Sequence, residues 1–293
     1  MCDWVRDCAD LLSPIVRHMQ KIILQSKKIH TDDTPVPVQD GSRTQTRKGY
    51  LWAYIGDNND VVFDYTSTHS RDGPVAFLGD YSGYVHADAY KGYDVFFEKG
   101  KATEVACWAH TRRKFYDSLT TDPKRAHEML AMIGRLYDVE RQAKEDYMDA
   151  IALNELRQQH SKSILDEIRS RLEDWSIEVL PKSPIGQAVG YARGQWIALN
   201  RYTEDGDLDI DNNLAERVLR IVAIGRKNWL FAGSDAGAER ASTIYSLIAS
   251  CKLCDIDPFE YLRDILDRIS TNPVRKIAEL TPSGWKRYLE IYK

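Results

Sequence analysis

The sequence lacks the features that mark membrane-spanning and disulfide-stabilised proteins. No apolar run is long enough to cross a bilayer, and the N-terminus carries an amphipathic pattern where a signal peptide would have a basic and then an apolar region. The five cysteines form no even framework, which indicates reduced thiols and a cytosolic protein. Cys251 and Cys254 make a lone C-x-x-C in an apolar helical pattern, so we expect packed free thiols there and no metal or redox site.

An excess of charge of one sign is also absent. The formal net charge of the 293 residues is −4, with 29% charged and 43% hydrophobic residues. This balance excludes attraction of polyanions by the molecule as a whole, so any contact with nucleic acid must come from local basic patches. The length and hydrophobic content are sufficient for about two domains with cores of their own.

Common catalytic motifs are missing as well. The sequence has no G-x-S-x-G elbow, no glycine-rich phosphate loop and no dinucleotide-binding fingerprint. Chemistry that depends on a serine nucleophile of that type or on a nucleotide cofactor is therefore not indicated. What the chain does contain is carboxylates near the ends of predicted elements, with cations close to them in sequence.

The order of predicted elements indicates an α/β fold. Residues 3–26 predict one or two amphipathic helices, interrupted near Pro14. Strands are predicted at 28–38, 50–55, 61–65, 83–88 and 103–109, with 56–60 as a hairpin loop and short helices at 73–78 and around 93–97. Pro35 and Pro37 confine the end of the first strand to an edge or a bulge. A helix opening with basic residues follows at 112–116, and this order is that of the ribonuclease-H-like fold, a mixed five-stranded sheet flanked by helices.

The remaining pattern is helical and suggests an insertion. Residues 118–205 predict helices only, and we expect them to form an all-helical domain that interrupts the sheet domain. The expected segments are an N-terminal helical segment (1–27), the first part of the core (28–117), the insertion (118–205), the last helix and loop of the core (206–240) and a C-terminal helical region (241–293). From residue 271 onward the sequence predicts only a polar and aromatic tail.

Three carboxylates are candidate metal ligands. Asp32 lies in the first predicted strand, Asp88 at the end of the fourth, and Glu216 in the first turn of a later helix. The first and fourth strands are neighbours in a ribonuclease-H-like sheet, so the two aspartates would project side by side and a helix packed across them would supply Glu216. Such carboxylates attract Mg²⁺. Two ions roughly 3.5–4 Å apart can activate a water or a 3′-hydroxyl and stabilise the leaving oxygen of an in-line displacement.

Glu216 also has a purely structural interpretation, and the local pattern alone favours it. Asn213 and Glu216 fit a capping box, and Glu216 and Arg220 have the spacing of an i,i+4 ion pair. On a helical wheel, however, Glu216 falls at the border of the apolar face, where a carboxylate can face a cleft. Both interpretations stay open at this level.

Cations and one indole near these carboxylates are candidate DNA contacts. Alternatives are a solvated face for the basic run and core packing for the indole. His86 is not assigned to the metal, because imidazole suits Mg²⁺ poorly. His110 could lie near the metal site, but a structural role is favoured for it. The candidate DNA-binding residues are Arg112, Arg113, Lys114, Arg217, Arg226, Lys227 and Trp229.

Several long segments carry a family resemblance. They are His30-Thr-Asp-Asp-Thr-Pro35, Gly83-Tyr-Val-His-Ala-Asp-Ala-Tyr90, Ala106-Cys-Trp-Ala-His-Thr-Arg-Arg-Lys-Phe115, residues 209–237, Tyr245-Ser-Leu-Ile and Asp257-Pro-Phe-Glu-Tyr-Leu262. In this order, from near residue 3 to about residue 268, they resemble the motif series of DDE transposases of the insertion-sequence-66 family. The resemblance implies a DDE triad at Asp32, Asp88 and Glu216. It further implies strand cleavage and transfer at transposon ends that depend on Mg²⁺, with Mn²⁺ able to substitute.

The resemblance also implies partners and a location. Double-stranded DNA (transposon ends and target), other copies of the chain on that DNA and element-encoded accessory proteins are expected, in the bacterial cytoplasm and on the nucleoid. Asp33 stands where the family often has glutamate. Family members usually carry a long N-terminal part before this region, so we expect a truncated or deliberately short form. The alternatives are a ribonuclease-H-like nuclease without strand transfer and an inert fragment that binds DNA or partner proteins.

Overall fold

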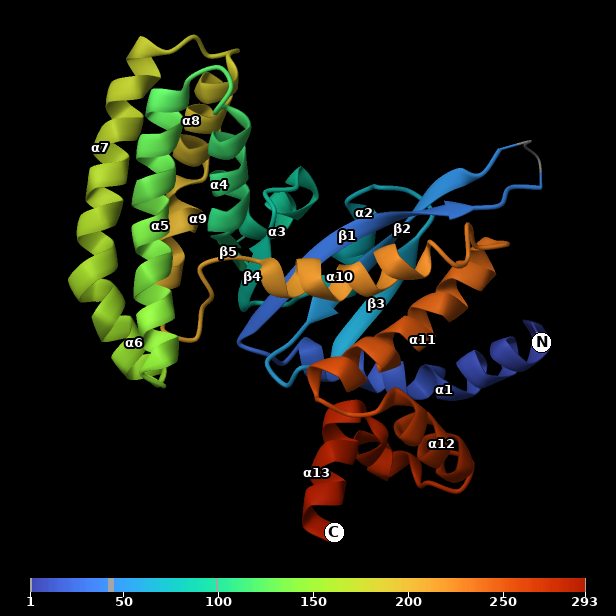
Figure 1. Ribbon diagram of the computed structural model, residues 1–293. Coiled ribbons are helices and arrows are strands. Elements are labelled where there is room, and N and C mark those ends of the chain that lie inside the picture. The colour runs from blue at the N-terminus through green and yellow to red at the C-terminus, as the bar shows by residue number, and fades with distance from the viewer. Residues whose placement is uncertain (1, 42–44, 99, 293) are drawn as a thin grey trace. The chain divides into compact units, whose positions relative to one another are not determined.

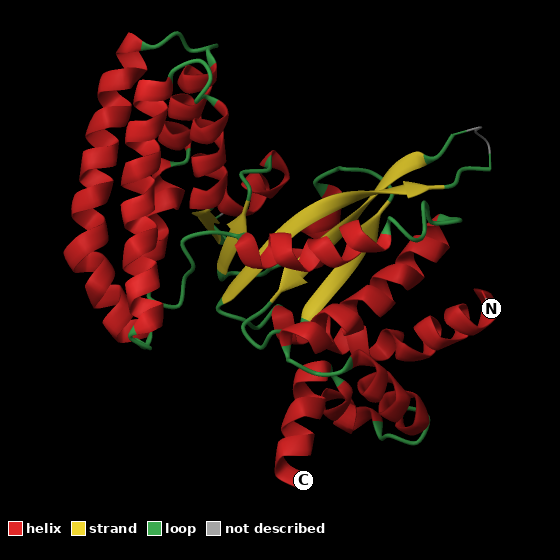
Figure 2. Ribbon diagram, in the orientation of Figure 1, coloured by secondary structure: helices red, strands yellow, loops and turns green. Residues whose placement is uncertain are grey.

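The computed structural model describes residues 2–41, 45–98 and 100–292 (Figure 1). Its sheet has five strands in the order β3-β2-β1-β4-β5, and Figure 2 shows the strands in yellow and the helices in red. The strands are β1 (Lys28–Val38), β2 (Arg47–Ile55), β3 (Val61–Thr66), β4 (Tyr84–Ala87) and β5 (Thr103–Ala106). This mixed α/β architecture, with a long helical stretch between β5 and the last part of the chain, confirms the ribonuclease-H-like prediction.

The helices follow the predicted order, with more of them near the C-terminus than expected. They are α1 (Cys2–Ile23), α2 (Asp72–Leu78), α3 (Asp94–Glu98), α4 (Trp108–Asp117), α5 (Pro123–Glu145), α6 (Ala150–Leu156), α7 (Lys162–Glu178), α8 (Pro184–Gly194), α9 (Trp196–Asn200), α10 (Asn213–Gly225), α11 (Asp235–Leu253), α12 (Pro258–Arg268) and α13 (Pro282–Tyr292). Short 3-10 segments occur at Lys91–Tyr93, Arg201–Thr203 and Val274–Leu280, and a π-helical turn at Arg157–Ser161. No helix in these described stretches is long and apolar enough to cross a membrane.

The chain divides into two compact units. Unit 1 comprises Met1–Val85, Tyr90–Thr103 and Leu214–Lys293, and unit 2 comprises His86–Ala89 and Glu104–Asn213. Unit 1 therefore contains most of the sheet with α1, α10 and the C-terminal helices, whereas unit 2 is almost entirely helical. The five sequence-based segment boundaries remain a prediction.

The N-terminal helix of unit 1 is continuous, so the interruption expected near Pro14 is wrong. Proline at this position removes the N–H that would bond the carbonyl of Asp10. The Ser13 hydroxyl donates to that carbonyl instead, at 3.0 Å. Leu12, Ile15 and Met19 are all buried on the other face of α1. Burial of this face and the substitute hydrogen bond together explain why the helix continues past the proline.

The backbone nitrogens of Pro35 and Pro37 in β1 lie on the side of the strand that faces away from β2. β1 lies in the interior of the sheet order, and its prolines stand near its C-terminal end, where Val38 forms an isolated bridge with Ala232. The carbonyl of Pro37 accepts from the N–H of Ala232 at 2.9 Å, and Gln39 donates back to Ala232 at 2.7 Å. Because a residue's N–H and C=O point to the same side of a strand, the missing proline N–H groups face away from β2 and no ladder bond to β2 is lost.

The core of unit 1 lies between one face of the sheet and helices α10 and α11. The β2–β3 hairpin is confirmed, with Asn59 in the left-handed region at a φ of 64° within its loop. The core cluster consists of Val36, Val38, Leu51, Ala53, Ile55, Val61, Phe63, Tyr65, Ala215, Val218, Leu219, Val222, Ala238 and Ala249. On the opposite face, Phe77 of α2 stacks on Tyr54 of β2 with ring centroids 3.6 Å apart.

The expected strand at 103–109 is shorter in the structure, and the helix after it begins earlier. β5 ends at Ala106 and α4 begins at Trp108. The Trp108 indole is fully buried in unit 2 and donates to the carbonyl of Leu199 at 2.8 Å, which favours a helix start at this residue. As a result, the basic run from Arg112 lies beyond the first turn of α4, and His110 belongs to the helix and not to the strand.

The segment after residue 271 is a packed helical region, so the predicted tail is wrong. Trp285 of α13 contacts Tyr261 of α12 edge to face, and the Tyr261 hydroxyl donates to the Leu280 carbonyl at 2.6 Å.

The cysteine thiols of α11 and its C-terminal end are packed as predicted: Cys251 and Cys254 are buried and free. Burial, with a smaller contribution from Cys254, raises the pKa of the Cys251 thiol to about 12, which disfavours the thiolate that metal binding needs.

Candidate active site

Asp32 lies on the face of β1 that α10 covers. Its cross-strand partner is Ala53, and Ala53 in turn lies opposite Phe63. Both belong to the core cluster beneath α10, and side chains directly opposite each other share a face of the sheet. The backbone N–H of Asp33 donates to Oδ1 of Asp32 at 2.8 Å, which restrains the orientation of the carboxylate.

Asp33 points to the other face of the same sheet. Its register partner is Trp52, and its Oδ1 lies 2.9 Å from Nε2 of His69. The His69 ring stacks on Trp52, with ring centroids 5.2 Å apart. Two adjacent aspartates therefore have different surroundings, because successive side chains in a strand alternate between the faces.

Glu216 lies in the first turn of α10, half-buried at the edge of the core. Its neighbour Ala215 is fully buried, as is Val218. The structure departs from the capping box suggested by the sequence, since α10 begins at Asn213 and the Asn213 side chain donates to Oδ2 of Asp211 at 2.6 Å. Arg220 is exposed and makes no ion pair among the described residues, so the expected i,i+4 pair with Glu216 is not formed.

The segment that leads into α10 is held by backbone contacts within unit 2. The N–H of Trp108 donates to the Ile210 carbonyl at 3.2 Å, and the N–H of Asn212 donates to the Cys107 sulfur at 3.2 Å. Oδ2 of Asp211 also accepts from the Tyr137 hydroxyl at 2.9 Å. Within unit 2, these contacts join residues 210–212 to the end of β5 and to α5.

Asp88 directly follows β4, the strand next to β1 in the sheet order. The residue after it, Ala89, has a φ of 58°, a left-handed conformation that costs energy for a residue with a Cβ. Such outliers cluster at functional sites, where the surrounding structure compensates for the strain. Within unit 2, burial first and then the charges of Cys107 and Asp88 raise the pKa of Tyr191, so Asp88 lies within electrostatic range of that ring.

The donor atoms of this candidate site are suited to a hard cation. Asp32, Asp88 and Glu216 are half-buried carboxylates, and Mg²⁺ selects carboxylate oxygen and water over nitrogen or sulfur. Asp32 and Glu216 belong to unit 1 and lie on the same side of its sheet, whereas Asp88 belongs to unit 2. The convergence of the three carboxylates remains a prediction.

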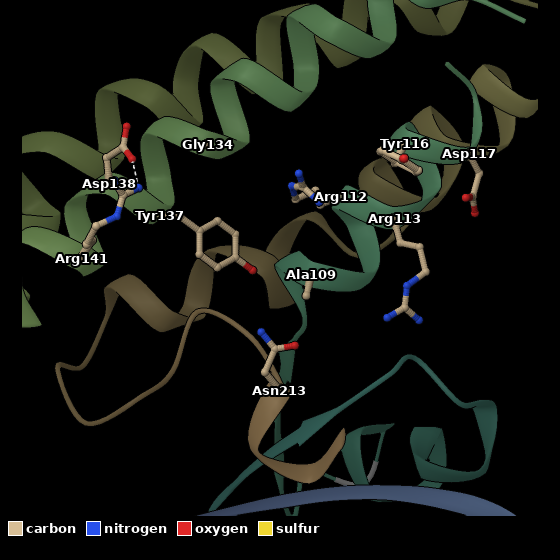
Figure 3. A pocket seen from close by; sticks show the side chains of 10 residues that line it. All are labelled: Ala109, Arg112, Arg113, Tyr116, Asp117, Gly134, Tyr137, Asp138, Arg141 and Asn213. Carbon is tan, nitrogen blue, oxygen red and sulfur yellow. Dashed lines mark hydrogen bonds and ion pairs between the residues drawn. The ribbon is translucent and has the colours of Figure 1, made fainter. Parts of the chain in front are cut away.

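A basic pocket of about 650 Å³ lies within unit 2, between α4 and α5 (Figure 3). Arg112 and Arg113 line it from α4, and Tyr137 and Arg141 from α5. Arg141 pairs with Asp138, while Arg112 makes no ion pair among the described residues. Burial, together with the negative charge of Asp211, raises the pKa of the Tyr137 hydroxyl, so this hydroxyl stays a neutral hydrogen-bond donor. Since the Tyr137 hydroxyl donates its proton to Asp211, the groups that the pocket presents to phosphate oxygens are guanidiniums.

The basic run on α4 does not act as one surface. Lys114 does not line the pocket, and its ammonium lies 4.5 Å from the centre of the Tyr191 ring, over its face. Helical periodicity explains the difference, since a shift of one or two residues turns a side chain to another side of the helix. Arg112 and Arg113 are therefore placed differently from Lys114, although all three are exposed.

The other candidate DNA contacts lie on α10 and the loop after it, in unit 1. Arg217 and Lys227 are exposed. Arg226 donates to the carbonyl of Pro35, and the Trp229 indole packs against the core cluster and donates to the Tyr245 hydroxyl at 2.7 Å. Trp229 thus follows the core-packing alternative, and Arg226 makes a contact inside the protein that the sequence did not indicate.

Sequence reasoning assigned only Arg112 and Arg113 of the residues that line the pocket in unit 2. Among those that it missed are Tyr116, Tyr137 and Arg141. A signal was present in the sequence, because Gly134, Tyr137 and Arg141 are spaced by three and four residues and share one face of a helix. That face looked like an ordinary solvated surface, and only the packing of α4 beside α5 made it one wall of a pocket.

Comparison with known proteins identifies the family of the chain. Residues 1–240 match the Transposase IS66 family, and residues 246–283 match the IS66 C-terminal element. In Sinorhizobium fredii (strain NBRC 101917 / NGR234), the uncharacterized protein y4hP is 30% identical over 98% of this chain and 56% of its own length. The uncharacterized protein y4jD of the same strain is 29% identical over 97% of the chain and 58% of its own length.

The chain thus spans a little over half the length of these relatives. The two family matches follow one another along the chain and together reach from residue 1 to residue 283. They include all three candidate carboxylates and both groups of candidate DNA contacts. The chain belongs to the IS66 family of transposases.

Proposed function

We propose that this chain is the catalytic part of a DNA transposase that cleaves and transfers DNA strands by a DDE triad. Asp32, Asp88 and Glu216 form the triad. The observation that carries the proposal is the position of Asp32 on the sheet face beneath α10, the helix whose first turn presents Glu216. Family membership supports an enzyme of the polynucleotidyl transferase class.

In this proposal the three carboxylates hold Mg²⁺, and Mn²⁺ can replace it. When bound, the ions activate the attacking hydroxyl and stabilise the leaving oxygen of the phosphodiester. Asp32 contributes an oxygen whose orientation is restrained by the N–H of Asp33. Glu216 contributes from a helix that is held to the core by Ala215 and Val218. Rigid support of this kind matters because catalytic geometry tolerates little displacement.

The basic pocket of unit 2 is proposed to hold the DNA backbone. Arg112 is exposed and lacks an ion-pair partner among the described residues, so its charge is available to a phosphate. The Tyr137 hydroxyl already donates to Asp211 and lies at the wall of the same pocket. Phosphate contacts position the duplex without reading its sequence. Arg113 lines the same wall of the pocket, and in this proposal it meets the backbone too.

The test compares two neighbouring aspartates that face opposite sides of the sheet. Purified protein is incubated with Mg²⁺ or Mn²⁺, transposon-end duplexes and a target plasmid, and nicked and joined products are counted. Asp32→Asn and Glu216→Gln should each lower product formation by about 1,000-fold or more, because each removes one ligand charge from the metal site. Asp33→Asn is the matched control and should keep activity within about tenfold, since it is turned away from α10.

Each outcome of this assay separates the candidate functions. Joined products support strand transfer, whereas nicks without joining favour a ribonuclease-H-like nuclease. DNA binding without any chemistry favours an inert binding fragment. If Asp32→Asn and Asp33→Asn have equal effects, or if Glu216→Gln keeps near-normal activity, the triad assignment is wrong.

A further inference from the structure

The outer side of α10 carries a row of cations that ends in exposed apolar side chains. Arg217, Arg220, Ile224 and Lys227 follow one another at spacings of three, four and three residues, so they share one side of the helix and its continuation. All four are exposed, and Ile224 is 54% exposed. In the segment 213–231 no exposed position carries a carboxylate. We name these four residues the α10 stripe.

None of the three cations of the stripe is neutralised within the protein. Arg217, Arg220 and Lys227 form no ion pair and no side-chain hydrogen bond among the described residues. Most other arginines of the chain do have such partners, for example Arg135 with Glu167. At 1.5 Å per residue, the stripe is about 15 Å long, which corresponds to about four base pairs of duplex DNA.

Beyond the stripe, the chain presents two large apolar side chains to solvent. Leu230 is 72% exposed and Phe231 is 45% exposed. The backbone that carries them is nevertheless firmly held. Ala232 exchanges backbone hydrogen bonds with Pro37 and Gln39 of the β1 end, at 2.9 and 2.7 Å. Because the segment is anchored, these two apolar side chains stay in contact with water, and exposed apolar groups of this kind often mark an interaction site.

Two side chains on the inner side of the loop complete the anchor. Trp229 donates to the Tyr245 hydroxyl, and Arg226 donates to the Pro35 carbonyl. A Cβ at position 225 would displace the Tyr245 hydroxyl and the Trp229 indole, so Gly225 allows these two side chains to pack close to α10. The loop is thus fixed from inside while its outer tip, Leu230–Phe231, stays uncovered.

We propose that duplex DNA lies along the α10 stripe and that Leu230 and Phe231 act as an apolar wedge against its bases. The inference rests on the proposed function and adds the DNA path on unit 1. Arg217, Arg220 and Lys227 contact successive phosphates, and the wedge contacts the base stack at the end of the stripe. Apolar side chains that enter a base step kink the duplex, and nearby cations hold its backbone. In this arrangement Arg226 and Trp229 position the loop and do not contact DNA.

The test uses an end-labelled duplex of about 30 base pairs with a donor and an acceptor dye at its two ends. Binding is measured over a range of salt concentrations, and bending is measured as energy transfer. The triple change Arg217→Gln, Arg220→Gln, Lys227→Gln should reduce the slope of log affinity against log salt by about 3. The double change Leu230→Ser, Phe231→Ser should keep the slope, weaken binding about tenfold or more and abolish the increase in energy transfer.

Matched controls use residues far from the stripe in sequence. Lys252→Gln removes one exposed cation of α11, and Phe259→Ala removes an apolar side chain that is 69% exposed. Neither should change the salt slope by more than about 1 or alter the bend. All variants change exposed side chains, and their thermal midpoints are measured to confirm that they are folded.

Failure of this inference can be told from failure of the proposed function. If the stripe and wedge variants bind and bend DNA like wild type while strand chemistry proceeds, the DNA path is wrong and the catalytic proposal stands. If the variants change self-association in sedimentation but not DNA binding, the surface is a contact between copies of the chain and the inference is overturned. If wild type neither binds the duplex nor shows metal-dependent chemistry, both proposals are wrong.

Discussion

At the scale of single residues, two aspartates on one face of the sheet have different surroundings. Asp33 and Asp64 both flank Trp52 in the strand register, on the face that α10 does not cover. Asp33 has His69 as a partner. Asp64 is half-buried, and this burial, with a smaller contribution from the charge of Glu239, raises its pKa from 3.8 to about 6. Such a carboxyl titrates close to physiological pH.

The raised pKa of Asp64 predicts a specific dependence of stability on pH. Between about pH 4 and pH 6 the folded state binds more protons at this site than the unfolded state, so the free energy of unfolding falls as pH rises through this window. Asp64→Asn removes the titration. We expect this variant to be more stable than wild type at pH 7.5, by at most about 3 kcal/mol, and no more stable than wild type at pH 4.

Urea unfolding at both pH values measures this difference. Asp166→Asn, a change at an exposed aspartate of unit 2, is the control and should alter stability by less than about 0.5 kcal/mol at either pH. If Asp64→Asn is less stable than wild type at pH 7.5, the carboxylate makes a favourable interaction that outweighs its burial, and the expected sign is wrong.

At the scale of elements, helix α11 protects the outer edge of the sheet. β3 is an edge strand in the sheet order, and edge strands expose unpaired N–H groups that favour aggregation. The Phe63 N–H donates to Oγ of Ser246, and the Val61 N–H donates to Oγ of Ser250, both at 2.8 Å. Ser246 and Ser250 lie one turn apart on α11, and their hydroxyls thus accept from alternate N–H groups of β3.

Removal of these hydroxyls should destabilise unit 1. Ser246→Ala and Ser250→Ala each leave a buried backbone N–H without its acceptor, which costs about 1–3 kcal/mol. Ser242→Ala is the matched control one turn earlier, because that hydroxyl donates to Glu239 of its own helix. Thermal denaturation should rank the two test variants below the control. Equal midpoints for all three would mean that water or a shifted strand replaces the lost acceptors.

The elements themselves were largely predictable from local pattern. The hairpin of β2 and β3, the end of α10 at Gly225 and the helical character of residues 118–205 follow from periodicity and turn residues. The start of α4 was not predictable from local pattern, because the strand pattern continues to Ala109. Burial of the Trp108 indole decides where the helix begins. The tail beyond residue 271 was missed for a similar reason, since Trp285 is recognisable as core only once Tyr261 lies against it.

At the scale of the whole molecule, each compact unit contains its own stabilising centre. In unit 2 this centre is Arg157, whose side chain is only 1% exposed. It binds both carboxylate oxygens of Glu140, at 2.8 and 2.6 Å, and also donates to the carbonyls of Tyr202 and Asp205. Arg157 therefore ties α5 and the π-helical turn to the segment that leads toward α10.

Arg157→Ala should destabilise unit 2 by about 3–5 kcal/mol, because it leaves the part-buried Glu140 carboxylate without its partner. Hydrogen exchange should increase in residues 104–213 and change little in β2 and β3. Arg135→Ala, which removes an exposed ion pair with Glu167, is the matched control and should cost less than about 1 kcal/mol. An Arg157→Ala variant with wild-type exchange in unit 2 would refute this role.

The sequence by itself determined the element order, the three candidate carboxylates and the family, because periodicity, turn residues and long motifs are local properties of the chain. Only the tertiary structure decided which face of β1 carries Asp32, that Ser246 and Ser250 satisfy an edge strand, and that Arg226 and Trp229 turn inward while Leu230 stays exposed. These outcomes depend on pairing register and on contacts between residues far apart in the chain. No local pattern encodes them, since the same side chain can face solvent or core according to what packs beside it.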